Sequence, residues 1–273
     1  MHKFLRAIGF SDITKKDLEM ILDEVITRPE IMKITKDSEG NEFAELSGSF
    51  AANAGITVRG TYQEDDSFHM DYYYPYVFGT SITTNEQIDV EKHAEKESYA
   101  GVCDEVNLGV TLIFYIQNVA DYLAETNRHL SKIHYGAMLA GLSTEGKILC
   151  PVVERKKNDV PAIQKNDRHN QLIAQAREGD EDAIESLTLE DMDTYALLSQ
   201  RVMKEDIFSI VKSTFMPFGI ESDQYTVLGE IIDCVTMENK LTHEKLYGMK
   251  LLCNNIQFDV CINEKDLLGE PRS

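Results

Sequence analysis

Apolar residues recur at every second position through four segments in the first third of the chain. The alternation runs through residues 32–34, 44–50, 56–62 and 68–74, with turn-forming residues between the segments. Successive side chains of a strand point to opposite sides, so this alternation predicts strands with one buried and one solvated face. We therefore expect an antiparallel meander whose even-numbered residues face the core and whose odd-numbered residues face solvent.

The short connection at residues 63–67 predicts the register of the last two strands. It sets Tyr62 opposite Phe68, and it sets Val58 opposite Tyr72. A slip of one residue would turn apolar side chains into water, so the pattern favours this register. On the outer face a cation, a base, a carboxylate and a phenol then lie close together, namely Arg59, opposite Asp71, with His69 and Tyr73 beside them.

These four outer-face residues are our candidate ligand-binding residues. A base, a carboxylate and a phenol within reach of one another could bind a small ligand or transfer protons. A solvated sheet face held by cross-strand pairs explains the same residues without any ligand, and we prefer that interpretation. The four residues are Arg59, His69, Asp71 and Tyr73.

Helical periodicity appears before this meander and again in the second half of the chain. The first helix is expected at residues 14–28, where Thr14 and Asp17 can form a capping box and Pro29 ends the helix. A short helix at residues 117–127 is expected after a buried strand at 108–116. Further helices are predicted at residues 167–178, 180–187, 188–203 and 205–212.

The chain ends in predicted strands at residues 225–237, 246–253 and 256–262. The last two form a hairpin, because Asn254 and Asn255 tolerate the positive φ of a tight turn. This hairpin sets Leu251 opposite Phe258, Met249 opposite Val260 and Tyr247 opposite Ile262, and it turns Cys253 and Cys261 to opposite faces.

The polar stretch 154–166, which carries Pro161, is the best candidate for a linker. It divides a helix-plus-meander part at 1–154 from a part at 163–273 with helices and the hairpin. The sequence therefore predicts an α+β fold: an N-terminal helix plus antiparallel meander, then C-terminal helices followed by antiparallel strands. Whether the two parts are separate domains or one joined core stays open.

Charge narrows the set of partners. The 273 residues carry 27 Lys and Arg against 47 Asp and Glu, a formal charge of −20, and both halves share the excess. A polyanion is bound mainly through cations that neutralise phosphates, so we expect no nucleic acid partner and no anionic membrane partner. No apolar run approaches the roughly 20 residues of a membrane-spanning helix. Five irregularly spaced cysteines are typical of a reducing compartment, and we expect a soluble, cytoplasmic protein.

Familiar catalytic and metal-binding motifs are missing. The sequence has no Cys-x-x-Cys, no His-Glu-x-x-His, no calcium loop, no Gly-x-Ser-x-Gly and no phosphate-binding glycine loop. We predict no catalytic residue, no metal site and no cofactor. The acid-rich stretch 178–193 is explained mostly by favourable charges at helix starts, with a divalent cation site or a partner surface as alternatives.

Three stretches resemble an uncharacterised family of cytosolic proteins from anaerobic Gram-positive bacteria, a domain of unknown function. They are the opening MHKFLRAIGF, a long central segment that begins AREGDEDAIESLTLEDMDTYALL, and the tail CNNIQFDVCINEKDLLGEP. The resemblance covers most of the chain and implies a cytoplasmic protein. It implies no activity, ligand or catalytic residue.

Three hypotheses about function remain after these exclusions. The leading one is a non-enzymatic cytosolic module that binds a protein partner or a small ligand, because structural signals are well formed while catalytic ones are missing. An enzyme with a dispersed active site is the second. The third is a structural role through self-association, because antiparallel edge strands invite pairing.

Overall fold

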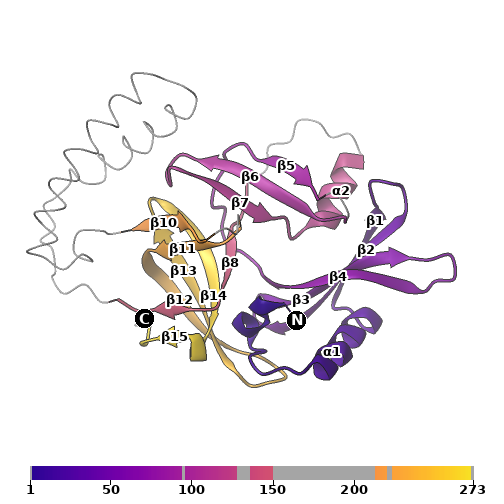
Figure 1. Cartoon of the computed structure of the whole chain (residues 1–273), viewed down its shortest axis with the longest axis horizontal. Helices are drawn as coiled ribbons and strands as arrows, with labels where there is room; N and C mark the ends of the chain where they lie inside the picture. Colours follow the sequence, from indigo (N-terminus) through magenta and orange to yellow (C-terminus); the bar gives the residue numbers. More distant parts are fainter. Residues whose placement is uncertain (1, 94–95, 128–135, 150–212, 220–222, 272–273) are drawn as a thin grey trace, which may run out of the picture.

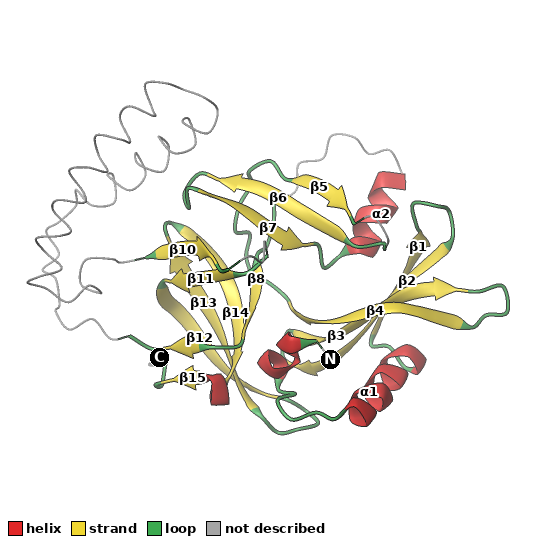
Figure 2. Cartoon of the chain, viewed as in Figure 1, coloured by secondary structure: helices red, strands yellow, loops and turns green. Residues whose placement is uncertain are grey.

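A computed structural model describes residues 2–93, 96–127, 136–149, 213–219 and 223–271. The described part is a mixed α+β protein in which strands predominate over helices (Figures 1 and 2). Most strand pairs are antiparallel, and the strands form several small sheets. Within the described residues, no helix is long and apolar enough to cross a membrane.

The N-terminal part is a helix followed by a four-stranded antiparallel sheet. A short 3₁₀ helix η1 (Lys3–Ile8) precedes helix α1 (Lys15–Thr27), and the sheet has the order β1-β2-β3-β4. The predicted capping box is present, because the Thr14 hydroxyl accepts from the backbone N–H of Asp17 and the Asp17 carboxylate accepts from the backbone N–H of Thr14. The strands are β1 (Ile31–Lys36), β2 (Glu42–Ala51), β3 (Ala54–Tyr62) and β4 (Phe68–Val77).

On β2 and β3 the even-numbered face packs on α1, as the alternation predicts, whereas Met32, Ile34 and Met70, predicted for the same buried face, are exposed. Leu46, Ile56 and Val58 are fully buried and share one hydrophobic cluster with Leu22 and Val25 of α1. Complete burial of such side chains contributes about 1.5–3 kcal/mol each. This face is therefore the main core of the N-terminal part.

The prediction of a solvated odd-numbered face is wrong for β2 and β3, although His69 and Asp71 of β4 are exposed. Phe43, Glu45, Thr57 and Arg59 point to that face and are buried. Helix α2 (Val119–Asn127) covers it, and Phe43 packs in a cluster with Val119, Ala120, Leu123 and Tyr99. The sheet is thus covered on both faces, because an element about 75 residues further along the chain folds back onto it.

A β-bulge between β3 and β4 overturns part of the predicted register. Tyr62 does lie opposite Phe68, but the pairing then shifts between Arg59 and Gly60. Arg59 lies opposite Tyr72 instead of Asp71, and Val58 lies opposite Tyr73 instead of Tyr72. One extra residue in one strand reverses which side chains face the core beyond it. Tyr72 and Tyr74 are consequently on the same face as Arg59.

A three-stranded sheet lies beside the first one. Its antiparallel strands are β5 (Asp89–Lys92), β6 (Tyr99–Glu105) and β7 (Val110–Tyr115), in that order. The predicted strand at 108–116 is present as β7, and the predicted short helix at 117–127 is present as α2.

The C-terminal sheet has the order β12-β13-β14-β8. Strands β13 (Lys245–Cys253) and β14 (Ile256–Asn263) form the predicted hairpin with its predicted register, and Asn254 and Asn255 have positive φ of 44° and 69°. Strand β8 (Ala140–Ser143) joins the edge parallel to β14. Strand β12 (Glu230–Glu238) and strand β11 (Tyr225–Leu228) replace the single strand predicted at 225–237.

Both faces of the hairpin are buried, as the opposite orientations of its two cysteines imply. Cys253 packs in a cluster with Phe215 and Phe258. Cys261 packs in the cluster that also holds the α1 residues, and its thiol donates to the backbone oxygen of Ala7 in η1 (3.2 Å). Residues at the two ends of the described chain therefore share one core.

The remaining elements are short. Strand β10 (Thr214–Pro217) pairs with β11, and β9 (Gly146–Lys147) pairs with β15 (Leu267–Leu268) after the 3₁₀ helix η2 (Glu264–Asp266). The helices predicted at 167–212, the acid-rich stretch 178–193, the linker at 154–166 and the domain boundaries at 154 and 163 lie outside the described residues.

A carboxylate joins η1 to the C-terminal hairpin. Glu244 accepts hydrogen bonds from the hydroxyl of Ser11 (2.7 Å), the amide of Asn263 (2.6 Å) and the ammonium of Lys265 (2.7 Å). Burial on its own would raise the pKa of Glu244, but the hydrogen bonds from Lys265, Ser11 and Asn263 outweigh it and hold this pKa below its ordinary value.

The lowered pKa of Glu244 predicts how its contribution to the stability of the fold depends on pH. The ionised form of Glu244 is favoured in the folded state, so its contribution is present above the unfolded pKa of about 4.3 and is lost as the pH falls further. Glu244→Gln should reduce the free energy of unfolding by about 1.5 kcal/mol at neutral pH and by much less near pH 3. Urea titrations across this range measure the difference. Glu64→Gln, in the exposed β3–β4 turn, is the control. If Glu244→Gln lost the same free energy of unfolding at neutral pH and near pH 3, the lowered pKa of Glu244 would be contradicted.

Candidate binding cleft

Arg59 is the centre of a buried polar cluster between the first sheet and the segment after β7. Only 2% of Arg59 is exposed. Its guanidinium donates to the carboxylate of Glu45 (2.9 Å), to the hydroxyls of Tyr72 (2.8 Å) and Tyr74 (2.7 Å), and to the backbone oxygens of Ile116 (3.2 Å) and Gln117 (2.7 Å). These bonds attach the strands β2, β3 and β4 to the chain at residues 116–117.

The hydroxyls around Arg59 complete a closed network. Tyr72 donates to the backbone oxygen of Glu97 (2.8 Å), and Tyr74 donates to that of Gln117 (2.9 Å). Burial raises the pKa of Tyr74, so its hydroxyl stays protonated and continues to donate. Burial also raises the pKa of Glu45, which the charge of Arg59 opposes. A network of this kind has a structural role, since its donors already have acceptors within the protein.

The structure brings only two of the four candidate ligand-binding residues together. His69 and Asp71 lie 3.9 Å apart at the surface, and the side chain of His69 is 70% exposed. Tyr73 points to the opposite face from Arg59, packs against the main core and accepts a hydrogen bond from the backbone of His2 (3.3 Å). Arg59 and Tyr73 are thus separated by the sheet. That the four residues bind a ligand stays a prediction.

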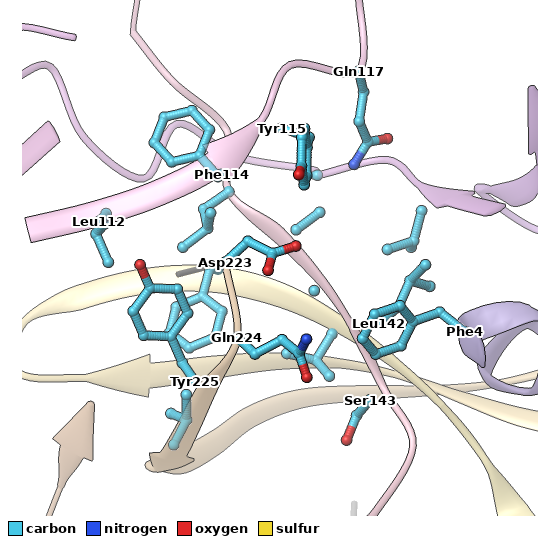
Figure 3. A pocket seen from close by; sticks show the side chains of 18 of the residues that line it. Phe4, Leu112, Phe114, Tyr115, Gln117, Leu142, Ser143, Asp223, Gln224 and Tyr225 are labelled. Atoms are coloured by element: carbon cyan, nitrogen blue, oxygen red, sulfur yellow. The ribbon is translucent and has the colours of Figure 1, made fainter. Parts of the chain in front are cut away.

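A large cleft opens where the three main sheets and η1 meet. Its volume is about 3330 Å³, and its walls come from β4, β7, β8, the β10–β11 pair and η1. Figure 3 shows Phe114 and Tyr115 on one side of this space, and Leu142 and Phe4 on another. Residues 116–118 also line it, so the Arg59 cluster holds part of its wall in place.

The walls of the cleft carry several large apolar side chains that are exposed to solvent. Large apolar side chains that line the cleft and remain exposed are Phe78, Tyr115, Met138, Leu149, Met216, Phe218 and Leu268. Contiguous exposed apolar surface on a protein usually marks a place where another molecule binds. The cleft is therefore the strongest candidate for a functional site in the described chain.

Polar side chains also line the cleft. Figure 3 shows Gln117, Ser143, Gln224 and Asp223 directed into it among the apolar walls. The ammonium of Lys3 donates to Gln224 (2.8 Å), and the hydroxyl of Ser143 donates to the backbone oxygen of Glu145 (2.7 Å). Walls that combine apolar surface with polar groups are typical of binding sites.

Metal and thiol chemistry have no assembled site in the described ranges. Nowhere in them do three or more His, Cys, Asp or Glu side chains come together as metal ligands would. Burial raises the pKa of Cys103 and Cys253 to about 11 and that of Cys261 to about 12. These thiols therefore stay protonated near neutral pH, where a thiolate would be needed for attack on a substrate.

Comparison with known families identifies the chain. A family model described as "Domain of unknown function, E. rectale Gene description (DUF3881)" matches residues 5–273. The chain belongs to this family. The match confirms the resemblance to an uncharacterised family, and its description names no activity or ligand. No curated protein and no solved structure matches the chain.

Sequence reasoning missed the cleft of this DUF3881 protein because its walls come from segments far apart in the chain. Phe4, Tyr115, Leu142 and Asp223 are each unremarkable in their local sequence. One signal did point to a covered second face of the first sheet. Phe43 is a large apolar residue at an odd-numbered position, which a solvated face does not favour.

Proposed function

We propose that this DUF3881 protein is a non-enzymatic binding module that holds a polypeptide segment of a partner protein in the cleft. The size of the cleft carries the proposal. Pockets for small molecules occupy about 300–1,000 Å³, whereas this cleft measures about 3330 Å³. A small metabolite would leave most of its apolar wall in water, but a peptide segment with several apolar side chains would cover it.

The setting of this function is the cytoplasm. Cys103, Cys234, Cys253 and Cys261 are free thiols, which supports a reducing compartment. The charge of −20 supports a protein partner over a nucleic acid. The family resemblance points to the same compartment.

Blocking the cleft should abolish peptide binding. Linear peptides selected on the wild-type protein from a randomised display library would be measured by calorimetry against Ser143→Trp and Gln117→Trp, both of which place an indole in the cleft. We expect each variant to bind at least about ten-fold more weakly, because the new indole would occupy space that an anchor side chain of the peptide needs. Buried anchor side chains are a main source of binding energy.

The matched control is Met20→Trp, which adds the same side chain to the exposed surface of α1, outside the cleft walls. Melting temperatures identify any variant that has not folded, and the two cleft variants serve as replacements for each other. Selection of no wild-type binder, or equal binding to the wild-type protein and to the folded cleft variants, would overturn the proposal.

A further inference from the structure

Asp223 is the one charged side chain among the residues labelled in Figure 3, and it projects into the centre of the cleft. It precedes strand β11 and is half-buried. Phe114, Tyr115 and Gln117 line the same cleft, and Tyr225 lies two residues further along the chain. A half-buried carboxylate in a cleft can be reached by a ligand group.

The Asp223 carboxylate has no hydrogen-bonded or ion-pair partner within the described chain. Lys3 also lines the cleft, but its ammonium donates to Gln224 (2.8 Å). His2 interacts electrostatically with Asp223 but makes no hydrogen bond or ion pair with it.

The surroundings of Asp223 suit a positively charged group. Aromatic rings attract ammonium and guanidinium ions, and Phe114, Tyr115 and Tyr225 are among the residues that line the same cleft. A net charge of −20 also attracts cationic ligands to the protein and repels anionic ones. The carboxylate and the aromatic residues of the cleft thus favour the same kind of ligand group.

We propose that Asp223 binds a lysine or arginine side chain of the segment that occupies the cleft. This inference rests on the proposed function and deepens it, because it names the charge of the partner. The occupant is then a basic, partly apolar peptide segment. Its cation pairs with the Asp223 carboxylate, and its apolar side chains cover the exposed walls.

The test pairs a change in the protein with a change in the peptide. Each selected peptide would be compared with a copy in which its lysine is replaced by norleucine, or its arginine by citrulline. We expect the wild-type protein to prefer the charged peptide by about ten-fold or more. Asp223→Asn should lose this preference while retaining binding through the apolar walls.

The matched control is Asp66→Asn. It removes the same charge from the exposed β3–β4 turn, at a residue with positive φ that asparagine also tolerates. This variant should keep the full preference. Selected peptides without lysine or arginine, or a preference that Asp223→Asn leaves unchanged, would overturn the inference.

These outcomes separate the two proposals. If Ser143→Trp and Gln117→Trp abolish binding but Asp223→Asn leaves the preference unchanged, the cleft is a peptide site and only the role of Asp223 falls. If the folded cleft variants bind as the wild-type protein does, or no peptide is selected, both proposals fall.

Discussion

Replacing Arg59 by methionine is expected to destabilise the protein by about 3–5 kcal/mol, the cost of removing one partner from a buried ion pair. Arg59 and Glu45 are both almost fully buried. Methionine would leave the Glu45 carboxylate without its cation and would leave the backbone oxygen of Ile116 without this donor. Unpaired buried polar groups lose their hydration without compensation.

Urea unfolding monitored by circular dichroism measures this loss. A double variant, Arg59→Met with Glu45→Leu, should recover at least about half of it, because an apolar pair avoids the buried charge altogether. Tyr72 and Tyr74 keep their backbone acceptors in both variants. If the double variant were no more stable than the single one, the buried charge would not be the cause.

A surface ion pair provides the comparison. Lys15 and Glu19 lie 3.8 Å apart on α1, and both side chains are largely exposed. Lys15→Met should change the free energy of unfolding by no more than about 0.5 kcal/mol, because exposed pairs contribute little. Similar losses for Arg59→Met and Lys15→Met would contradict the structural role of the buried cluster.

Gly60→Ala is expected to have the second largest effect, a loss of about 3 kcal/mol, at the upper end of typical overpacking costs. Gly60 lies at the bulge that turns Tyr72 and Tyr74 toward Arg59. A Cβ atom at this position would lie 2.0 Å from the backbone oxygen of His69. Neither backbone can yield without breaking the pairing that defines the bulge, so the arginine cluster would be disturbed as well.

A second strand glycine is the matched control for this variant. At Gly141 in β8, a Cβ atom would meet its nearest neighbour at 3.7 Å, an ordinary contact. Gly141→Ala should therefore change the free energy of unfolding by at most about 0.5 kcal/mol. Urea unfolding of both variants decides the matter, and equal losses would show that close approach at Gly60 is not responsible.

Local signals in the sequence were sufficient for several elements. The capping box of Thr14 and Asp17, the strands β2 and β3, and the register of the hairpin around Asn254 and Asn255 are all present. Each depends on residues within about ten positions of one another. Spacing and turn chemistry at that range determine backbone geometry almost independently of the rest of the chain.

The sequence by itself thus determined the α+β class, the first helix, the strands of the meander and the terminal hairpin. Only the tertiary structure decided the bulge at Arg59 and Gly60, because tyrosines such as Tyr72 and Tyr74 suit a buried or a solvated face equally and hide the shift. It alone also decided that α2 covers the polar face and that a cleft forms around Asp223. Those features depend on which distant segments come into contact. Such contacts produce no periodic pattern in the sequence of either segment.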